Sequence, residues 1–322
     1  MRVLVAAIGC LLASGAAFAA DVKLRLGHAT TTESTQHQAA LKLSELVKER
    51  TKGAVEISVF PASSLGSDQQ MINLTRGGAI DIVFSGSSNF NGIVPQTALL
   101  EMPFVFRDSA HAYKVLDGTV GQSLLDELGK HGLKGLAYFE NGWRALTNNK
   151  RPVRTPEDAK GLKLRSTPNP YHLQAFRLLG MNPSPLPISE LYSALETRAF
   201  DAQEHPIPVL WSSKFYEVQK FLTVSNHAYS PIVAAMHKPK FDGLPPEHQK
   251  VIVDSAREAA AFQRDLNMKE ARTLIEGLKK AGMQVVEQPD MTPFRTIVYG
   301  PVRKAFVEKN GADLIDAIEA EK

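Results

Sequence analysis

The segment Val22-Lys23-Leu24-Arg25-Leu26 alternates apolar and charged residues, and Val55, Ile57 and Val59 repeat this alternation further along the chain. A period of two predicts a β-strand in each place. Residues 80–84 predict a third strand, and the chain between the three strands has the pattern of helices. This β-α-β-α-β order predicts an α/β fold whose sheet is largely parallel and carries helices on its faces.

Both helices between these strands have predicted ends. The first covers residues 35–51 with its apolar side chains on one face, and Gly53 is placed to end it. The second begins after a cap at Ser67 or Asp68 and runs to Gly77-Gly78. Each of the three strands is therefore joined to the next by one helix.

The second half of the chain predicts further elements, and after Asn141 we expect the chain to cross into a second lobe. Strands are predicted at residues 133–138, 144–148, 163–166 and 200–203, and helices at 109–130, 171–179 and 189–197, the last one capped by Ser189. A long helical pattern follows Pro245-Pro246 and stops at Gly282. At 1.5 Å per residue this helix spans roughly 55 Å, which is long enough to run along two lobes.

The N-terminus and the cysteine content predict an exported, periplasmic protein. Arg2, the apolar stretch behind it and Ala17-Phe18-Ala19 have the pattern of a secretory signal peptide over residues 1–20, with cleavage near Ala19 or Ala20. The only cysteine, Cys10, lies inside this segment. The mature chain is therefore expected to have neither a disulfide nor a cysteine metal site.

Size, charge and missing motifs restrict the class of protein further. The roughly 300 residues that follow the leader usually form two lobes. The net charge of +3 falls to +2 without Arg2, and this balance argues against a nucleic-acid-binding protein. The sequence contains no His-Glu-x-x-His helix and no Gly-x-Ser-x-Gly turn, so neither a zinc hydrolase nor a serine hydrolase is indicated.

The stretch from Gly161 to Pro206 carries the main candidate binding residues. It opens with Gly161-Leu162-Lys163-Leu164-Arg165, an alternating strand that ends on an arginine, and closes with Asp201-Ala202-Gln203-Glu204-His205-Pro206. Arginine suits a carboxylate because its planar fork makes two parallel, charge-assisted hydrogen bonds. A surface salt bridge at the end of a strand is the alternative interpretation of Arg165.

Several motifs occur in an order that resembles the solute-binding proteins of tripartite ATP-independent periplasmic (TRAP) transporters, the dicarboxylate-binding DctP-type family. The resemblance covers nearly the whole mature chain, from about residue 23 to 318. Besides the strand that ends at Arg165, its motifs are Leu65-Gly66-Ser67-Asp68, Asp81-Ile82-Val83-Phe84-Ser85, Asn141-Gly142-Trp143-Arg144, Glu190-Leu191-Tyr192-Ser193-Ala194-Leu195 and Lys214-Phe215-Tyr216-Glu217-Val218-Gln219-Lys220.

The resemblance implies a two-lobed periplasmic binding protein-like fold with a central ligand cleft and a long helix shared by both lobes. Lobe I would comprise residues 21–142 and about 231–265, and lobe II residues 143–230 and about 266–322. A small organic acid would bind in the cleft, and the lobes would close over it. The loaded protein, a monomer without a cofactor, would then deliver the acid to the TRAP membrane permease subunits.

The resemblance also implies roles for polar residues of the second lobe. Arg165 would grip the ligand carboxylate, and Arg144 would reach the ligand as a second arginine, with an internal ion pair as the alternative. His205 is a candidate hydrogen-bond donor to the carboxylate or to a hydroxyl. Glu204 would repel an anionic ligand, so we expect it to orient an arginine or a backbone amide.

Five further side chains are candidates for the ligand site. Trp211 could stack on a sugar acid or an aromatic acid, or pack in the core. Ser87, Asn89 and His28 follow strands of the first lobe, at the edge where open α/β sheets place their ligands. Asp68 could bind a ligand hydroxyl or only cap its helix.

Departures from the family pattern concern the choice of ligand. His205 stands where asparagine is usual, and Ile188 stands where an aromatic residue is common. Gly86 and Asn89 replace the acidic residue and the arginine that sialic-acid-binding members carry. We therefore expect a smaller or less hydroxylated acid, such as an aldonate, a uronate or a branched hydroxy acid.

Other functions would require a similar site. A solute-binding protein of an ATP-driven (ABC) importer, or one that presents its ligand to a sensor kinase, has the same composition and needs the same cleft. An exported hydrolase is disfavoured because the nucleophile and metal motifs are missing. The sequence therefore predicts a transport protein that captures a hydroxylated organic acid and is not an enzyme.

Overall fold

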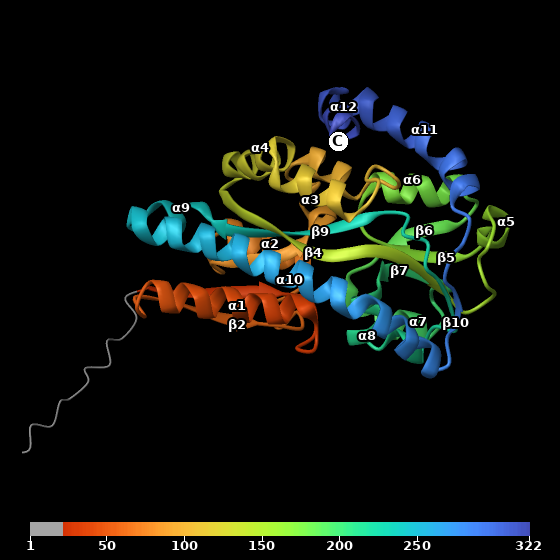
Figure 1. Ribbon diagram of the computed structural model, residues 1–322, viewed down its shortest axis with the longest axis horizontal. Helices are drawn as coiled ribbons and strands as arrows, with labels where there is room; N and C mark the ends of the chain where they lie inside the picture. The colour runs from red at the N-terminus through yellow and green to blue at the C-terminus, as the bar shows by residue number, and fades with distance from the viewer. Residues whose placement is uncertain (1–21) are drawn as a thin grey trace, which may run out of the picture.

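The computed structural model describes residues 22–322, so the predicted leader, residues 1–20, lies outside the described residues. Figure 1 shows a long molecule in which strands β4 (Leu133–Asn148) and β9 (Tyr229–His237) and helix α10 (Pro246–Lys280) run lengthwise. Different strands and helices gather around the two ends of these long elements. This is the arrangement of a two-lobed α/β fold.

The three strands of the predicted β-α-β-α-β unit pair in parallel, as expected, but the sheet as a whole is mixed. The strands of the sheet are β1 (Val22–His28), β2 (Val55–Phe60), β3 (Ile82–Gly86), β4, β5 (Lys163–Ser166), β6 (Asn182–Pro185), β7 (Ala202–Pro206), β8 (Phe221–Thr223), β9 and β10 (Gln284–Val286). The order is β2-β1-β3-β9-β4-β7-β5-β6, with β8 beside β4 and β10 beside β8. Pairing is parallel in the outer parts, but β9 and β4 are antiparallel to their neighbours.

β4 is one continuous strand where the sequence predicts two strands with a crossing at Asn141. Its pairing with β9 changes register between Glu140 and Gly142, which is a β-bulge. Gly142 has a φ of +116°, a conformation that glycine adopts without steric cost. The first part of β4 pairs with β9 and its last part with β7 and β8. This strand therefore joins the two halves of the sheet.

The helices begin and end largely where the sequence predicts. They are α1 (Thr35–Arg50), α2 (Asp68–Arg76), α3 (Ser109–Asp117), α4 (Thr119–Glu127), α5 (Pro156–Ala159), α6 (Pro170–Leu178), α7 (Ile188–Glu196), α8 (Ile207–Ser212), α9 (Lys238–Asp242), α10, α11 (Thr292–Asn310) and α12 (Asp313–Ala320), with 3₁₀ turns η1 (Ser87–Phe90), η2 (Pro95–Glu101), η3 (Leu128–His131) and η4 (Phe215–Glu217). Ser67 caps α2 through a capping box with Gln70. The predicted cap at Ser189 is wrong, because α7 begins at Ile188 directly after the extended Pro187.

One predicted helix, residues 109–130, is divided into α3, α4 and η3. Gly118 between α3 and α4 has a ψ of −165°, which no α-helix contains. The break brings α4 close to the end of α3, where a Cβ atom on Gly121 would lie 1.9 Å from the Leu116 carbonyl oxygen. The helical periodicity is present on both sides of the break, which is why the sequence pattern did not reveal it.

Helix α10 contributes to the cores at both ends of the molecule. It has 35 residues. Its first half adds Ile252, Ala256 and Ala259 to the core formed with β1, β2, β3 and α1. Its second half adds Leu278 to the core that contains residues of α7 and α8. The prediction of a long helix shared by both lobes is therefore confirmed.

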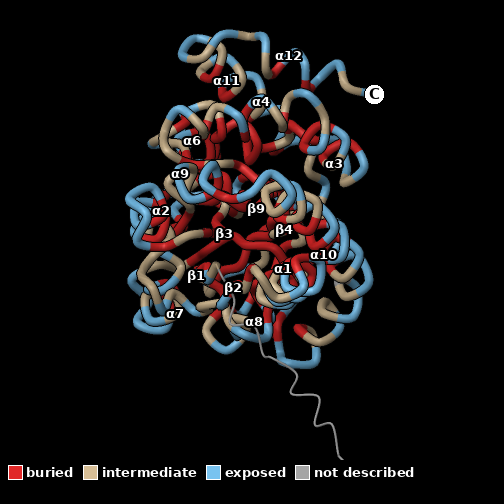
Figure 2. The backbone as a smooth tube through the Cα atoms, turned by 90° about the vertical axis from the view of Figure 1, so that its left-hand side faces the viewer, coloured by how far each residue is buried: buried red, intermediate tan, exposed pale blue. Residues whose placement is uncertain are grey.

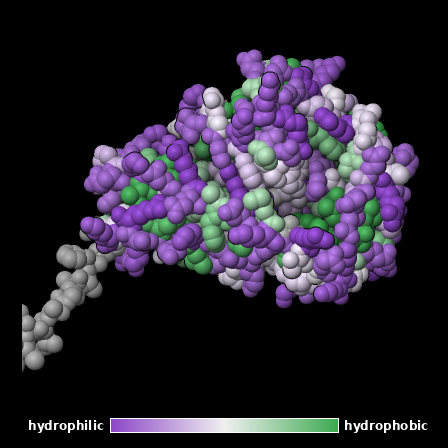
Figure 3. Space-filling view, viewed as in Figure 1, coloured by the Kyte–Doolittle hydropathy of each residue, from purple (hydrophilic) through white to green (hydrophobic). Residues whose placement is uncertain are grey.

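Burial follows this layered arrangement. Figure 2 shows buried residues along the central strands and exposed ones mainly on the outer helices and loops. In Figure 3, hydrophilic residues cover most of the visible face and apolar residues gather in small groups. None of the helices within residues 22–322 has the length and apolar character that crossing a membrane requires.

The tight contact between α3 and α4 predicts that Gly121→Ala destabilises the fold. The added Cβ would collide with the backbone oxygen of Leu116, which cannot move aside like the end of a side chain. We expect the free energy of unfolding to fall by about 1–3 kcal/mol or more, measured by urea denaturation. Gly129→Ala is the matched control, because a Cβ there meets nothing closer than 3.8 Å. Equal stability of the two variants would contradict this account of the break.

Candidate ligand-binding site

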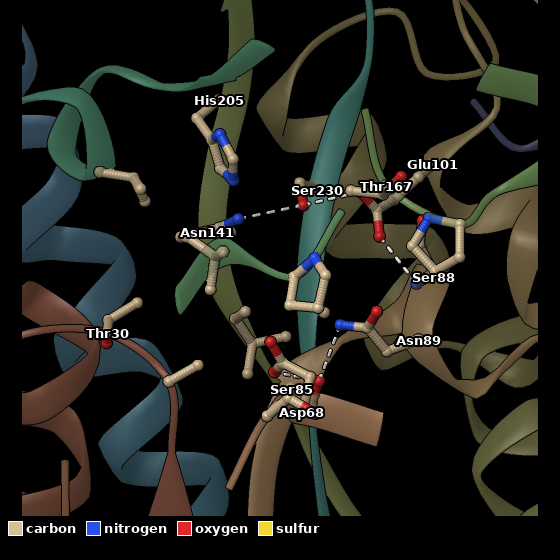
Figure 4. A pocket seen from close by; sticks show the side chains of 18 of the residues that line it. Thr30, Asp68, Ser85, Ser88, Asn89, Glu101, Asn141, Thr167, His205 and Ser230 are labelled. Atoms are coloured by element: carbon tan, nitrogen blue, oxygen red, sulfur yellow. Dashed lines mark hydrogen bonds between the residues drawn. The ribbon is translucent and has the colours of Figure 1, made fainter. Parts of the chain in front are cut away.

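A cavity of about 290 Å³ lies between the two halves of the molecule. Its walls come from the ends of β1 and β3 and the start of α2 on one side, and from β5, β7 and the loop after β6 on the other. Its polar lining includes Thr30, Gln36, Asp68, Ser85, Ser88, Asn89, Glu101, Asn141, Arg144, Arg165, Thr167, His205 and Ser230. Figure 4 shows His205 on one side of this pocket and Asp68, Ser85 and Asn89 on the opposite side.

Arg165 is buried at the wall of this cavity, on the strand β5 that the sequence predicts at the same residues. Its Nε and Nη2 atoms donate to the Leu186 carbonyl oxygen at 2.8 and 2.5 Å. Its Nη1 atom lies 3.3 Å from His205 Nε2. A guanidinium carries five N–H groups, so one N–H on each terminal nitrogen is left without a partner among residues 22–322. These two N–H groups form a fork that fits a carboxylate.

The Arg165 charge has no direct counter-ion in the part of the chain that the structure describes. No carboxylate oxygen of residues 22–322 lies within 4.0 Å of its guanidinium nitrogens. Burial, followed by the nearby positive charge of Arg144, lowers its pKa to about 10. The guanidinium is therefore still protonated at neutral pH. A buried, unpaired cation is costly, and an anionic ligand relieves that cost.

His205 positions Arg165 through a chain of buried side chains. His205 Nδ1 lies 2.6 Å from Gln203 Oε1, which only accepts hydrogen bonds, so the ring proton is on Nδ1 and Nε2 accepts from Arg165. Gln203 in turn donates to Thr147 Oγ1 at 2.7 Å, and Thr147 donates to Gln219 Oε1 at 2.8 Å. The expected donation from His205 to a ligand is not what this geometry favours, because both ring nitrogens are engaged within the protein.

The protonation state of His205 agrees with this arrangement. Burial, together with the charges of Arg165 and Arg144, holds the pKa of the His205 imidazole well below its usual range. The ring is therefore neutral at physiological pH and adds no second positive charge beside Arg165. His205 acts on the ligand through the orientation of the guanidinium.

Arg144 on β4 is the centre of a buried ion cluster. Its Nε atom donates to Glu204 Oε2, and its Nη2 atom donates to the Glu204 carbonyl oxygen at 2.6 Å. Its Nη1 atom donates to Glu101 Oε2 at 3.2 Å and to Ser230 Oγ at 3.1 Å. All four residues are almost completely buried. The expectation that Glu204 orients an arginine is confirmed, and Arg144 is held by two carboxylates.

The surroundings of Glu204 keep it ionised. Burial alone would raise the pKa of this carboxyl group, but the Arg144 charge beside it holds the pKa well below the usual range. Ser166 Oγ donates to Glu204 Oε1 at 2.9 Å, and His227 Nε2 lies 3.5 Å from Oε2. The cluster therefore holds fixed, opposite charges beneath the cavity.

Asp68, Ser85 and Asn89 form the opposite wall through a directed chain of hydrogen bonds. Asn89 Nδ2 donates to Ser85 Oγ at 3.0 Å, and Ser85 Oγ donates to Asp68 Oδ1 at 2.6 Å. Burial raises the pKa of the Asp68 carboxyl group, against the hydrogen bond from Ser85 and the charge of Arg165. Asp68 lies at the start of α2 but the cap itself is Ser67, so its side chain is free to serve the cavity.

The structure places three of the predicted ligand residues outside the cavity lining. Ser87 Oγ donates to Glu101 Oε1 at 2.9 Å and so supports the ion cluster. His28 is buried between Thr30 Oγ1 and His37 Nδ1, at 3.1 and 3.0 Å. Trp211 packs against Gly277 of α10, where a Cβ atom would lie only 2.8 Å from Cζ3 of its ring. The other five, Asp68, Asn89, Arg144, Arg165 and His205, all line the cavity.

Sequence reasoning missed several residues of the cavity. Ser85 and Ser88 lie at or just beyond the end of β3, so the rule that placed Asn89 there could have included them. Glu101 and Ser230 gave no sequence signal, because they are far from Arg144 in the chain and meet it only in the folded sheet. Within residues 22–322, no three or more His, Cys, Asp and Glu side chains are arranged to hold a metal ion.

Residues 26–309 match the family described as bacterial extracellular solute-binding protein, family 7 (DctP). The chain is 49% identical over 298 residues to the 2,3-diketo-L-gulonate-binding periplasmic protein YiaO of Escherichia coli (strain K12). This match covers 92% of the present chain and 91% of the relative. The relatives whose names state a function, among them a C4-dicarboxylate-binding periplasmic protein of Rhodobacter capsulatus, are binding proteins and not enzymes.

Solved structures share the same fold. A TRAP periplasmic solute-binding protein from Polaromonas sp. JS666, bound to D-erythronate, matches with a TM-score of 0.91 and 38% identity, over 94% of this chain and 99% of the other. The sugar acid binding protein DctPAm from Advenella mimigardefordensis (strain DPN7T), in complex with galactonate, matches with a TM-score of 0.88 and 34% identity, over 92% and 96% of the two chains.

The ion cluster predicts that Glu204→Gln strongly destabilises the protein. The substitution keeps the shape of the side chain but leaves the buried Arg144 with only one carboxylate. Breaking a buried ion pair costs about 3–5 kcal/mol, and we expect a loss of this size in the free energy of unfolding, measured by urea denaturation. Glu45→Gln removes an exposed partner of Lys42 and should change little. A stable Glu204→Gln variant would mean that Arg144 needs only Glu101.

The buried histidines predict that stability falls as the pH falls from 7.5 to 5.5. Burial lowers the pKa of His28 to about 3, and the pKa values of His172 and His205 are also lowered. In this window the unfolded chain binds protons on these residues and the folded chain does not, so unfolding is favoured at lower pH. The raised pKa of Asp68 acts in the opposite direction.

This pH dependence is measured by urea unfolding at pH 7.5, 6.5 and 5.5. Each histidine contributes up to about 1.4 kcal/mol per pH unit once the pH is below its ordinary value. In the variant His28→Gln, the free energy of unfolding should change less steeply with pH, because one fewer proton is bound on unfolding. A free energy of unfolding that stays constant or rises toward pH 5.5 would contradict the assignment.

Proposed function

The chain belongs to the bacterial extracellular solute-binding proteins of family 7, the TRAP-type binding proteins, and from this premise we propose that it captures a small hydroxylated monocarboxylate beside Arg165. The observation that carries the proposal is the buried Arg165 guanidinium, whose free fork faces no carboxylate of the described residues. A ligand carboxylate supplies the missing partner with two charge-assisted hydrogen bonds.

The opposite wall supports a hydroxylated ligand. Asp68, Ser85 and Asn89 present polar atoms to the cavity, and its volume of about 290 Å³ is at the small end for ligand pockets. The three relatives described above are named for 2,3-diketo-L-gulonate or hold D-erythronate or galactonate, and each of these ligands is a sugar acid with one carboxylate. A less similar protein, from Sulfurospirillum deleyianum at 30% identity, holds succinate, a dicarboxylate. We infer the class of the more similar relatives for this chain.

Capture would proceed by closure of the two lobes over the acid. We assign residues 21–142 and about 231–265 to lobe I, and residues 143–230 and about 266–322 to lobe II. The lobes would move about the bulge in β4 at Glu140 and Gly142, with α10 as the shared support. Arg165 would hold the carboxylate from one lobe while Asp68 and Asn89 contact hydroxyl groups from the other.

The loaded protein would act as a monomer in the periplasm and deliver the acid to the TRAP membrane permease subunits. Removal of residues 1–20 as a leader belongs to this proposal. The family match does not favour the alternatives of an ABC importer or a sensor kinase as the partner. Ser87, His28 and Trp211 would support the site from outside, through the contacts described above.

The proposal predicts that Arg165→Ala loses the ligand but keeps the fold. Each charge-assisted hydrogen bond contributes about 1.5–3 kcal/mol, so removal of the fork should weaken binding at least ~100-fold. The measurement is isothermal titration with D-erythronate, galactonate and gluconate, after a thermal-shift screen that includes neutral sugars and amino acids.

Arg165→Lys is the matched variant, because it keeps the positive charge but lacks the planar fork. We expect it to bind more weakly than the wild type and more tightly than Arg165→Ala. The melting temperature without ligand checks that each variant is folded. Unchanged affinity in Arg165→Ala would remove the carboxylate clamp, and a wild-type protein that binds only neutral solutes would overturn the proposed function.

A further inference from the structure

The charges around the cavity are distributed unequally between its two walls. Of the described residues that line it, only Arg144 and Arg165 carry a positive charge. Arg144 is already held by Glu101 and Glu204, and His205 is neutral. One fork, that of Arg165, is therefore available for a carboxylate of the ligand.

The wall opposite Arg165 presents an acidic group to the cavity. The chain from Asn89 through Ser85 to Asp68 uses one of the two Asn89 amide protons and the only Ser85 hydroxyl proton within the protein. Ser85 Oγ directs its only proton at Asp68 Oδ1 and has none left for a ligand. Asp68 Oδ2 has no hydrogen-bond partner among residues 22–322, so this wall ends on a free carboxylate oxygen.

A free carboxylate oxygen accepts hydrogen bonds and cannot donate them while it is ionised. A ligand hydroxyl or a diol supplies the missing donor. A second ligand carboxylate is itself only an acceptor, and it would place two negative charges close together in a partly buried site, which is unfavourable. This wall therefore favours a ligand that ends in a hydroxyl group and disfavours one that ends in a second carboxylate.

We propose that Asp68, fixed by Ser85 and Asn89, makes the site selective for acids with a single carboxylate and a distal hydroxyl, and that it excludes the corresponding dicarboxylates. This inference rests on the proposed function, because it takes the carboxylate at Arg165 as the fixed end of the ligand. The proposal gives Asp68 a role in ligand specificity. From the sequence alone, Asp68 could either bind a ligand hydroxyl or only cap its helix.

A competing explanation is that Asp68 only balances the charge of Arg165 across the cavity. Both residues influence each other electrostatically without touching. In that case Asp68 would weaken the binding of erythronate and of its 4-deoxy analogue, which carry the same charge, to the same extent. The two explanations differ in whether neutralising Asp68 changes the affinity ratio of these two acids or only their common affinity.

The test uses pairs of acids that differ at one end. Erythronate and meso-tartrate have the same four-carbon skeleton, and galactonate and galactarate the same six-carbon skeleton, but in each second acid the terminal CH₂OH is a carboxylate. Isothermal titration of the wild-type protein should give at least a ~10-fold preference for erythronate, for galactonate, or for both, over the matched diacid. The 4-deoxy analogue of erythronate should also bind more weakly, because it leaves Asp68 without a donor.

The decisive variant is Asp68→Asn, which keeps the size of the side chain and removes the charge. We expect the preference for the monocarboxylate to shrink at least ~5-fold, because the amide can donate to the second carboxylate. Asp68→Ser is a second variant that also removes the charge. It is used in case the new amide group alters the hydrogen bonds of Ser85 and Asn89. Glu45→Gln, which removes an exposed charge on α1, is the control and should leave the ratio unchanged.

The outcomes separate this inference from the proposed function. If wild-type protein binds both acids of each pair equally, or if Asp68→Asn strengthens both by the same factor, the selectivity role is overturned while the arginine clamp stands. If wild-type protein binds none of the carboxylates, the proposed function fails and the inference fails with it. Affinity ratios that narrow in Asp68→Asn and not in Glu45→Gln, that of erythronate to its 4-deoxy analogue included, support the inference.

Discussion

The buried ion cluster around Arg144 is the interaction on which the site depends. Two arginines and two glutamates, Arg144, Arg165, Glu101 and Glu204, lie together, so their formal charges cancel. Both carboxylates, however, bind Arg144 directly and leave Arg165 with neutral partners only. The near balance of charge keeps Arg165 protonated without a ligand, and the unequal pairing keeps its fork free. A single glutamate placed against Arg165 would remove the binding capacity.

The same strand that carries Arg144 also joins the two halves of the molecule. The bulge in β4 interrupts the regular ladder, and buried polar side chains of α10 bind the backbone there. Gln263 Oε1 accepts from the Glu140 amide at 3.0 Å, and Arg264 donates to the Tyr138 carbonyl oxygen at 3.0 Å. These contacts from α10 add to the pairing with β9 on either side of the bulge, so the joining strand is fixed by two neighbouring elements.

Local elements could be predicted from the sequence where one face is buried and the other exposed. β1, β2, α1 and α10 show this periodicity, and β5 was predicted at its observed residues. β9 was not predicted, because all but the last of its nine residues are buried and its apolar run has no alternation. The continuity of β4 was hidden by Asn141-Gly142, which reads as a turn and forms a bulge only because β9 pairs with it on both sides.

The sequence could predict a site residue only where its role does not depend on partners that are distant in the chain. Arg165 was predicted because it ends a strand inside a motif of the family, whereas Asp68, Ser85 and Glu101 are ordinary cap, strand and turn residues in the sequence. Their roles depend on which partner takes each proton, and this is decided when the start of α2 meets the end of β3 and when η2 meets β4. A binding site for a small acid is defined by the donors and charges that the protein leaves unpaired. Which donors and charges stay unpaired depends on the hydrogen bonds and ion pairs within the protein. These form between residues that are far apart in the chain and meet only in the fold.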